Sequence, residues 1–173
     1  MINESESLIE SLRLTPHPEG GYFRETFRSS QSVNTADGVR SSSTAIYYLL
    51  QAGDYSGWHR VRSDEAWHHY QGHPLHLHLL DEEGYRLVVL GPDVLRGEKP
   101  QFVVPANCWQ AAEVPGSGYA LCGCTVAPGF DFEDFEMASF DALLPLFPNR
   151  SHEDTIRRLI RIPKPEGVLH ESR

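Results

Sequence analysis

Residues 53–72 read GDYSGWHRVRSDEAWHHYQG, and this stretch decides the fold. Within it, the runs Gly57–Val61 and Glu65–Gln71 each have the length of a short β-strand, and no proline interrupts either. Alternate side chains of a strand share a face. One face of the second strand is therefore predicted to carry Glu65, Trp67 and His69.

The same short-strand pattern extends in both directions, from Gly20 to about Val126. Turn residues such as Glu83-Gly84 and Pro115–Gly118 separate the runs. Besides the two strands above, the predicted strands are Tyr22–Arg28, Thr44–Leu50, Leu75–Leu80, Tyr85–Leu90, Phe102–Val104, Trp109–Val114 and Tyr119–Val126. Short strands without helices between them favour an all-β antiparallel sandwich or barrel.

Helical patterns are confined to the two ends of the chain. The predicted helices are Glu6–Arg13, Ser139–Leu146 and Thr155–Ile160. Ser29–Ser43 contains Asp37-Gly38, which predicts a hairpin, and Phe130–Glu136 is predicted to cross one barrel end on its three phenylalanines. We expect one domain over residues 1–173, with a core of about 8–160 and a loose tail at 161–173.

Composition limits the possible partners. The 173 residues carry 15 basic and 24 acidic side chains, a formal net charge of −9, which argues against nucleic acid and against an anionic membrane surface. No apolar run is long enough to span a membrane. Three cysteines without a disulfide framework favour the cytoplasm, and Cys122 and Cys124 are interpreted as small core residues.

Histidine is concentrated in one region, with six of the nine between positions 59 and 78. In Leu75–Leu79 the leucines take one face of the strand, and His76 and His78 take the other. The pair is interpreted either as the polar face of a half-buried strand or as two metal ligands. The second interpretation needs a third ligand, which the sequence does not place.

The spacing in residues 53–72 resembles the first motif of the cupin superfamily. The order is Gly-x5-His-x-Val-x3-Glu-x6-Gly, with Val61 where that motif has its second histidine. Pro105–Gln110 resembles the second cupin motif less closely, and Gln110 stands where that motif has a histidine.

A closer resemblance covers the chain from about Leu8 to Ile160. The chain is identified as a member of the small cupin family long described as a domain of unknown function. The segments that carry the resemblance are Thr15–Glu25, Trp58–Val61, Asp64–His68, Trp109–Gln110 and Ala127–Phe132. It implies a double-stranded β-helix, the jelly-roll or cupin barrel, with short N- and C-terminal helices. It also implies a homodimer and a small-molecule ligand inside the barrel.

Cupin metal sites normally use three histidines and one glutamate. By the resemblance, the metal positions here are His59, Val61, Glu65 and Gln110, so a metal would depend on His59, Glu65 and Gln110. An amide oxygen is a weak ligand for the metals that imidazole prefers. No cofactor is therefore expected, and a divalent metal is the alternative.

Without metal, His59 is predicted to act as general base and Glu65 as general acid. The candidate substrate-binding residues are Arg24, Glu25, Arg28, Tyr48, Trp67, His69, Gln110 and Asp131. The leading hypothesis is a metal-independent isomerase or epimerase acting on a sugar-like or nucleotide-linked substrate, by analogy with cupin sugar epimerases. The alternatives are a metal-dependent oxygenase and a non-catalytic binding or sensor protein.

Overall fold

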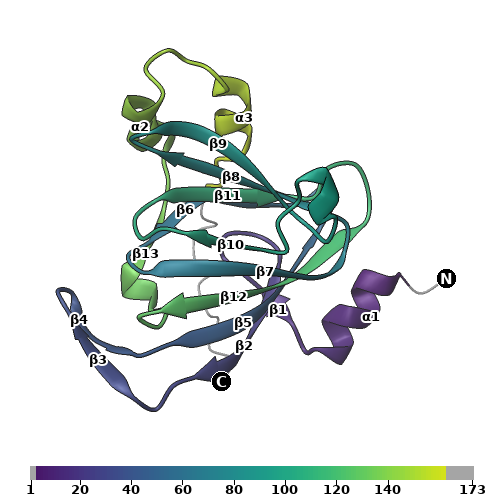
Figure 1. The fold of residues 1–173 in the computed structure, drawn as a ribbon, viewed down its shortest axis with the longest axis vertical. Helices are drawn as coiled ribbons and strands as arrows, with labels where there is room; N and C mark the ends of the chain where they lie inside the picture. The colour runs from purple at the N-terminus through teal and green to yellow at the C-terminus, as the bar shows by residue number, and fades with distance from the viewer. Residues whose placement is uncertain (1–2, 163–173) are drawn as a thin grey trace, which may run out of the picture.

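Two antiparallel sheets face each other in the computed structural model, which describes residues 3–162. The six-stranded sheet has the order β1 (Thr15–Pro16), β2 (Tyr22–Arg28), β5 (Thr44–Gln51), β12 (Tyr119–Ala127), β7 (Asp64–Gly72), β10 (Gln101–Val104). The five-stranded sheet has the order β13 (Phe135–Met137), β6 (Tyr55–Val61), β11 (Trp109–Glu113), β8 (Leu75–Asp81), β9 (Gly84–Leu90). Figure 1 shows the strands of both sheets crossing the molecule in one stack.

The predicted all-β jelly-roll class is confirmed, and each of the nine predicted strands is present. The Asp37-Gly38 hairpin is also present, as β3 (Ser32–Thr35) and β4 (Gly38–Ser41), and it projects from the barrel (Figure 1). The sequence did not predict β1, β13 or the 3₁₀ turns η1 (Val94–Arg96) and η2 (Phe132–Asp134).

The helices lie where they were predicted, but their ends are shifted. Helix α1 (Glu4–Ser11) begins two residues early because the side chain of Asn3 accepts a hydrogen bond from the Ser5 N–H. Helix α2 (Phe140–Leu143) continues into the 3₁₀ turn η3 (Leu144–Leu146). Helix α3 (Glu153–Arg158) also begins two residues early. Among residues 3–162, no helix combines the length and apolar character that a membrane crossing requires.

The expected tail begins inside the described part of the chain. Arg161 donates hydrogen bonds to Asp54 and to the Tyr55 carbonyl, and its guanidinium lies over the Tyr55 ring. Residues 163–173 lie outside the described residues.

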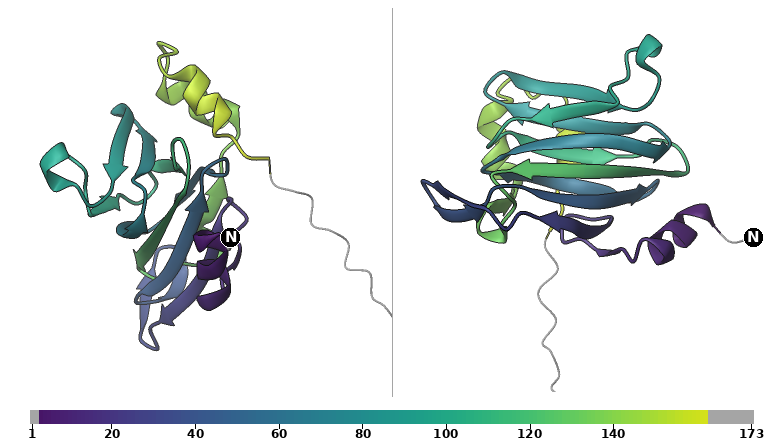
Figure 2. Two further views of the ribbon diagram at one scale, coloured as in Figure 1. Left: turned by 90° about the vertical axis from the view of Figure 1, so that its right-hand side faces the viewer. Right: turned by 60° about the horizontal axis from the view of Figure 1, so that its bottom comes forward.

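The five-stranded sheet has a cluster of buried side chains on each of its two faces. Leu75, Leu77 and Leu79 of β8 point between the sheets, together with Trp67 and Cys122. The outer face carries a second cluster, in which Trp58, Trp109 and Ala111 pack against the helices through Leu143, Phe147, Ile156 and Leu159. Figure 2 shows this helical cover at one end of the molecule and α1 at the other.

We expect Trp58→Phe to loosen the helical cover. Trp58 is fully buried, and its Nε1 donates a hydrogen bond to the Ile156 carbonyl at 2.9 Å. Phenylalanine keeps an aromatic ring but leaves that carbonyl unpaired, which should lower the free energy of unfolding by about 1–2 kcal/mol. Urea denaturation monitored by circular dichroism measures the change, and an unchanged midpoint would contradict the prediction.

Candidate active site

A β-bulge in β6 places two pocket residues on one face of the sheet. Against β11, Gln110 pairs with His59 but Ala112 pairs with Ser56, so β6 holds one extra residue at this point. Bulges of this kind re-aim side chains near functional sites. Gly57 and Trp58 both face outward, and Ser56 and His59 both face the pocket although they are three residues apart.

Two glycines bring a third residue, Glu19, beneath this strand. Gly20 has φ +110°, and a Cβ there would lie 2.1 Å from the Tyr55 carbonyl oxygen. Gly21 has φ +71°, and a Cβ there would lie 2.7 Å from the Tyr48 hydroxyl. Only glycine allows so close an approach in this conformation. The Glu19 carbonyl then accepts a hydrogen bond from the Gly57 N–H at 2.8 Å, so the segment is held against β6.

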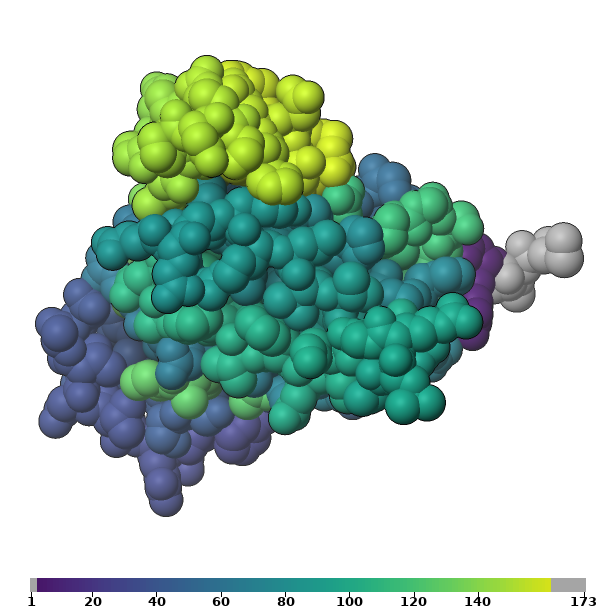
Figure 3. Space-filling view, turned by 45° about the horizontal axis from the view of Figure 1, so that its top comes forward, coloured from purple at the N-terminus to yellow at the C-terminus, as the bar shows by residue number. Residues whose placement is uncertain are grey.

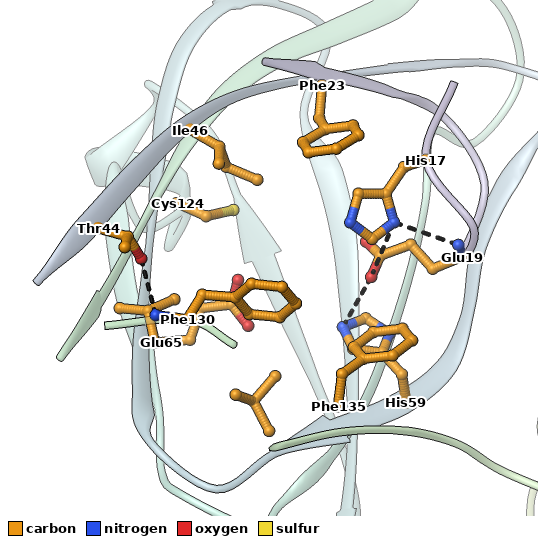
Figure 4. A pocket seen from close by; sticks show the side chains of 12 residues that line it. His17, Glu19, Phe23, Thr44, Ile46, His59, Glu65, Cys124, Phe130 and Phe135 are labelled. Carbon is orange, nitrogen blue, oxygen red and sulfur yellow. Dashed lines mark hydrogen bonds and ion pairs between the residues drawn. The ribbon is translucent and has the colours of Figure 1, made fainter. Parts of the chain in front are cut away.

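The buried Glu19 carboxylate is the centre of the polar cluster (Figure 4). Its Oε1 accepts a hydrogen bond from Ser56 Oγ at 2.9 Å. Its Oε2 lies 3.2 Å from His59 Nε2 and 3.6 Å from His17 Nδ1. Glu19 therefore links two imidazoles that lie 42 residues apart in the sequence.

The contacts of His59 define where protons sit. Its Nδ1 lies 2.8 Å from the Gly57 carbonyl oxygen, which only accepts, so Nδ1 carries a proton. Its Nε2 faces the Glu19 carboxyl, and that contact needs one proton between the two groups. His17 differs, because its Nδ1 accepts a hydrogen bond from the Glu19 N–H and burial lowers the pKa of the ring. The site thus contains a neutral His17 beside a His59–Glu19 couple that shares one proton.

A second polar chain lies across the pocket. Trp67 Nε1 donates a hydrogen bond to Gln110 Oε1 at 2.8 Å, and Gln110 Nε2 donates to Glu65 Oε2 at 2.6 Å. An indole N–H only donates, so it fixes which end of the Gln110 amide faces Glu65. Burial raises the pKa of Glu65 above its ordinary value, which favours a neutral carboxyl group.

Glu65 should make the stability of the protein fall with rising pH. The folded chain holds this proton more tightly than the unfolded chain, so the stabilisation is complete below the ordinary pKa of 4.5 and is lost as the pH rises through the higher folded value. We expect Glu65→Gln to flatten the decline between pH 4.5 and neutrality. Urea midpoints across that range test this, and an equally steep decline in the variant would contradict it.

Two neighbouring cavities, which share part of their lining, adjoin these groups. The inner pocket has a volume of about 40 Å³, which is room for about three or four waters at about 10–15 Å³ each, and Phe23, Phe130 and Phe135 give it an apolar wall (Figure 4). An outer chamber of about 230 Å³ shares Phe23 and Phe130 with it. A ligand can therefore place only a small reacting group beside His59, with its remainder in the outer chamber.

The predicted site residues divide into three sets. His59, Glu65, Gln110 and Trp67 come together as described, and Glu25, Arg28 and Asp131 line the outer chamber. Trp67 and Gln110 line neither cavity themselves and are connected to the pocket through Glu65, and the remaining three predicted residues also lie outside both cavities. Tyr48 is buried and donates to the Gly20 carbonyl, His69 faces the His73 carbonyl, and Arg24 lies over the Tyr47 ring.

Sequence reasoning gave no role to several residues of the pocket. They are His17, Glu19, Cys124, Phe130 and Phe135. His17 and Glu19 had a usable signal, since both belong to a segment with two prolines and two consecutive glycines, Pro16–Gly21. Cys124 was interpreted as core, and it is buried with its pKa raised well above the ordinary value by that burial.

Comparison with known families agrees with this geometry. The family model described as "Cupin superfamily (DUF985)" matches residues 6–138, well over half of the chain. The chain belongs to the cupin superfamily. This cupin is also 32% identical over 146 residues to an uncharacterised protein of Saccharomyces cerevisiae, a match that covers 75% of this chain and 72% of the yeast protein.

Some solved structures resemble this cupin in both sequence and fold, and others resemble it in fold alone. A hypothetical protein from Leishmania major has a TM-score of 0.82 and 37% identity, covering 91% of this chain and 98% of that one. A protein from Shewanella oneidensis has a TM-score of 0.82 and 36% identity, covering 95% and 100%. An oxalate decarboxylase from Bacillus subtilis, at a TM-score of 0.52 and 13% identity over 83% of this chain and 33% of its own, shares the fold alone.

The residues at the usual cupin metal positions do not fit a metal in this cupin. Val61 lines the pocket with an apolar side chain. Gln110 uses its amide oxygen to accept from Trp67 and turns its amide nitrogen, which is not a ligand, toward Glu65. At these positions only His59 and Glu65 remain as ligands of the usual kind, and an oxygenase metal needs two imidazoles and a carboxylate. Within residues 3–162, the His17, Glu19 and His59 side chains do not bring three ligand atoms within 4.8 Å of one another.

Proposed function

We propose that this cupin is a metal-independent isomerase or epimerase that moves a proton next to the carbonyl group of a sugar-like or nucleotide-linked substrate. The observation that supports it most is the His59–Glu19 couple, which shares one proton beside a cavity with room for a small reacting group. Buried groups of this kind, in a water-poor pocket, are typical of general acid–base catalysis.

The couple offers a base wherever its proton resides. When His59 Nε2 carries the proton, Glu19 is a carboxylate, and when Glu19 carries it, His59 Nε2 is free of a proton. The base takes the proton from the carbon beside the substrate carbonyl. The C–H electron pair forms the C=C bond of the enolate, and the negative charge moves to the carbonyl oxygen.

Glu65 is the proposed partner of that oxygen. Burial raises its pKa and so favours the protonated carboxyl, whose O–H can donate a hydrogen bond where the charge develops, and Gln110 holds the group in place. For the epimer, the couple keeps the proton that it took, and the Glu65 carboxyl protonates the same carbon from the opposite face. For the isomer, the couple returns the proton to the former carbonyl carbon, while the proton of the neighbouring hydroxyl moves to the former carbonyl oxygen.

The outer chamber supports a substrate with an anionic or hydroxyl-rich remainder. The Arg28 guanidinium is half-exposed there, and it pairs with Glu25 at 2.6 Å and donates to the Phe130 carbonyl. A guanidinium in this position suits phosphate or carboxylate recognition. Phe130 and Phe132 offer faces against which a sugar or base can stack.

Solvent-deuterium exchange tests the proposal. The full-length protein, treated with chelator, is first screened by thermal shift against carbonyl sugars, sugar phosphates and nucleotide-linked sugars. Ligands that bind are then incubated with it in D₂O and followed by NMR and mass spectrometry. We expect one ligand to gain a single deuterium beside its carbonyl and to yield its isomer or epimer, with the chelator present throughout.

The other outcomes identify the alternatives. Turnover that requires added metal would favour a metal-dependent oxygenase or related enzyme. Tight binding without any exchange would favour a binding or sensor protein.

The homodimer and the cytoplasmic location belong to the same proposal. The three free, buried cysteines support a reducing compartment. Native mass spectrometry of the purified protein tests the dimer, and a monomeric mass at micromolar concentration would contradict it.

A further inference from the structure

The outer face of the five-stranded sheet carries a second cluster of ionisable groups, separate from the pocket. In the register of β8 and β11, Glu113 lies opposite His76, and Ala111 lies opposite His78. His76, His78 and Glu113 therefore share the face that α3 covers. Figure 1 shows β8, β11 and α3 in this arrangement, and Figure 3 shows the helical segment seated on these strands.

The three side chains lie close enough to share an ion. One ligand atom from each falls within 4.8 Å of the others, and among residues 3–162 this is the one group of histidine, cysteine and acidic side chains that meets that condition. His78 Nε2 is already 3.0 Å from Glu113 Oε1. Tetrahedral ligands about 2.1 Å from a metal stand about 3.4 Å apart, so no separation has to close by more than about 1.4 Å. His76 is half-exposed and has room to make that movement.

We propose that His76, His78 and Glu113 bind a divalent first-row transition metal such as Zn²⁺, with water completing the coordination. Two imidazoles and one carboxylate are a common set for such ions. The site lies on the opposite side of the sheet from His59, so it is independent of the proposed catalysis.

The surroundings of His78 fit a ligand. Tyr85 Oη lies 2.8 Å from its Nδ1, so that nitrogen is held by an outer partner and Nε2 is left for the ion.

Arg158 connects the proposed metal ligand Glu113 to helix α3. It donates to both oxygens of Glu113, at 2.6 and 2.8 Å, from the last residue of α3. A metal on Glu113 Oε1 competes with one of these hydrogen bonds and repels the guanidinium. Arg158 is half-exposed and can turn toward solvent, so metal binding exchanges a helix–sheet ion pair for a metal ligand.

Calorimetric titration with Zn²⁺ tests the proposal on the full-length, untagged protein after chelator treatment. We expect one Zn²⁺ per chain, and binding at least about tenfold weaker in His76→Ala and in Glu113→Gln. Both variants alter partly buried side chains, of which Glu113 is 18% exposed, whereas the fully buried His78 is left intact so that folding is preserved. Arg158→Gln removes the competitor, and we expect it to tighten binding.

A matched control and a spectroscopic readout locate the ion. His68→Ala removes an imidazole from β7, where it contacts Thr125, and should leave the affinity unchanged. The Trp58 ring lies 6.4 Å from the His78 ring, so Cu²⁺ at the site should quench the fluorescence of the wild type more strongly than that of Trp58→Phe. Absence of Zn²⁺ binding, or equal affinity in His76→Ala and the wild type, would overturn the proposal.

Discussion

His59→Asn is expected to lower the rate of solvent-deuterium exchange into the substrate by about 10²–10⁴-fold, the usual contribution of a general acid–base group. Asparagine keeps a polar side chain beside Glu19 but cannot carry the shared proton. The loss should appear in kcat, while the affinity for the ligand changes little, because the proposal places most of the substrate in the outer chamber, away from His59. Exchange rates from NMR measure the effect on kcat, and dissociation constants from calorimetry measure the effect on ligand affinity.

The control for this variant is His68→Asn. His68 lies on β7 with its Nε2 3.0 Å from Thr125 Oγ1 and lines neither cavity. Its exchange rate should match the wild type. If His59→Asn exchanged at the wild-type rate with its fold intact, the couple would have no catalytic role.

Gln110→Leu is expected to lower the free energy of unfolding by about 2–5 kcal/mol. Gln110 is buried and serves two buried partners, the Trp67 N–H and the Glu65 carboxyl. Leucine has a similar size but leaves both groups unpaired, and each unpaired buried group costs about 1–3 kcal/mol. Urea denaturation at neutral pH measures the difference.

A double-mutant cycle separates the two contributions. In a Trp67→Phe background the indole N–H is already absent, so Gln110→Leu should cost about 1–3 kcal/mol less. If the cost is the same in both backgrounds, the Trp67–Gln110 hydrogen bond does not contribute to stability.

The strands were predictable because their signal is local. Alternating side chains and turn residues defined each long strand, whereas β1 and β13, at two and three residues, are too short to show alternation. The shifted helix ends have a similar cause. The first helix was predicted to begin at Glu6, but the side chain of Asn3 caps it two residues earlier.

The sequence predicted site residues only where they belong to the cupin spacing or alternate with a residue that does. The cupin spacing selected His59, Glu65 and Gln110, and alternation placed Trp67 beside Glu65. Glu19 lies 40 residues before His59, and the Gly20-Gly21 turn brings it into the pocket. No local pattern in the sequence indicates that this turn packs against β6. The bulge in β6 is equally non-local, because simple alternation would put Ser56 and His59 on opposite faces.

The alternation of β11 also limits how the length of this strand can vary. Gln110 and Ala112 face the space between the two sheets, while Ala111 and Glu113 face the helices. Deleting one residue within the strand would exchange these faces and turn the Glu113 carboxylate into the barrel interior. Insertions and deletions should therefore be tolerated only in the flanking turns, at 105–108 and 115–118. A change of length within the strand would disturb the Gln110 side and the Glu113 side of the sheet at the same time.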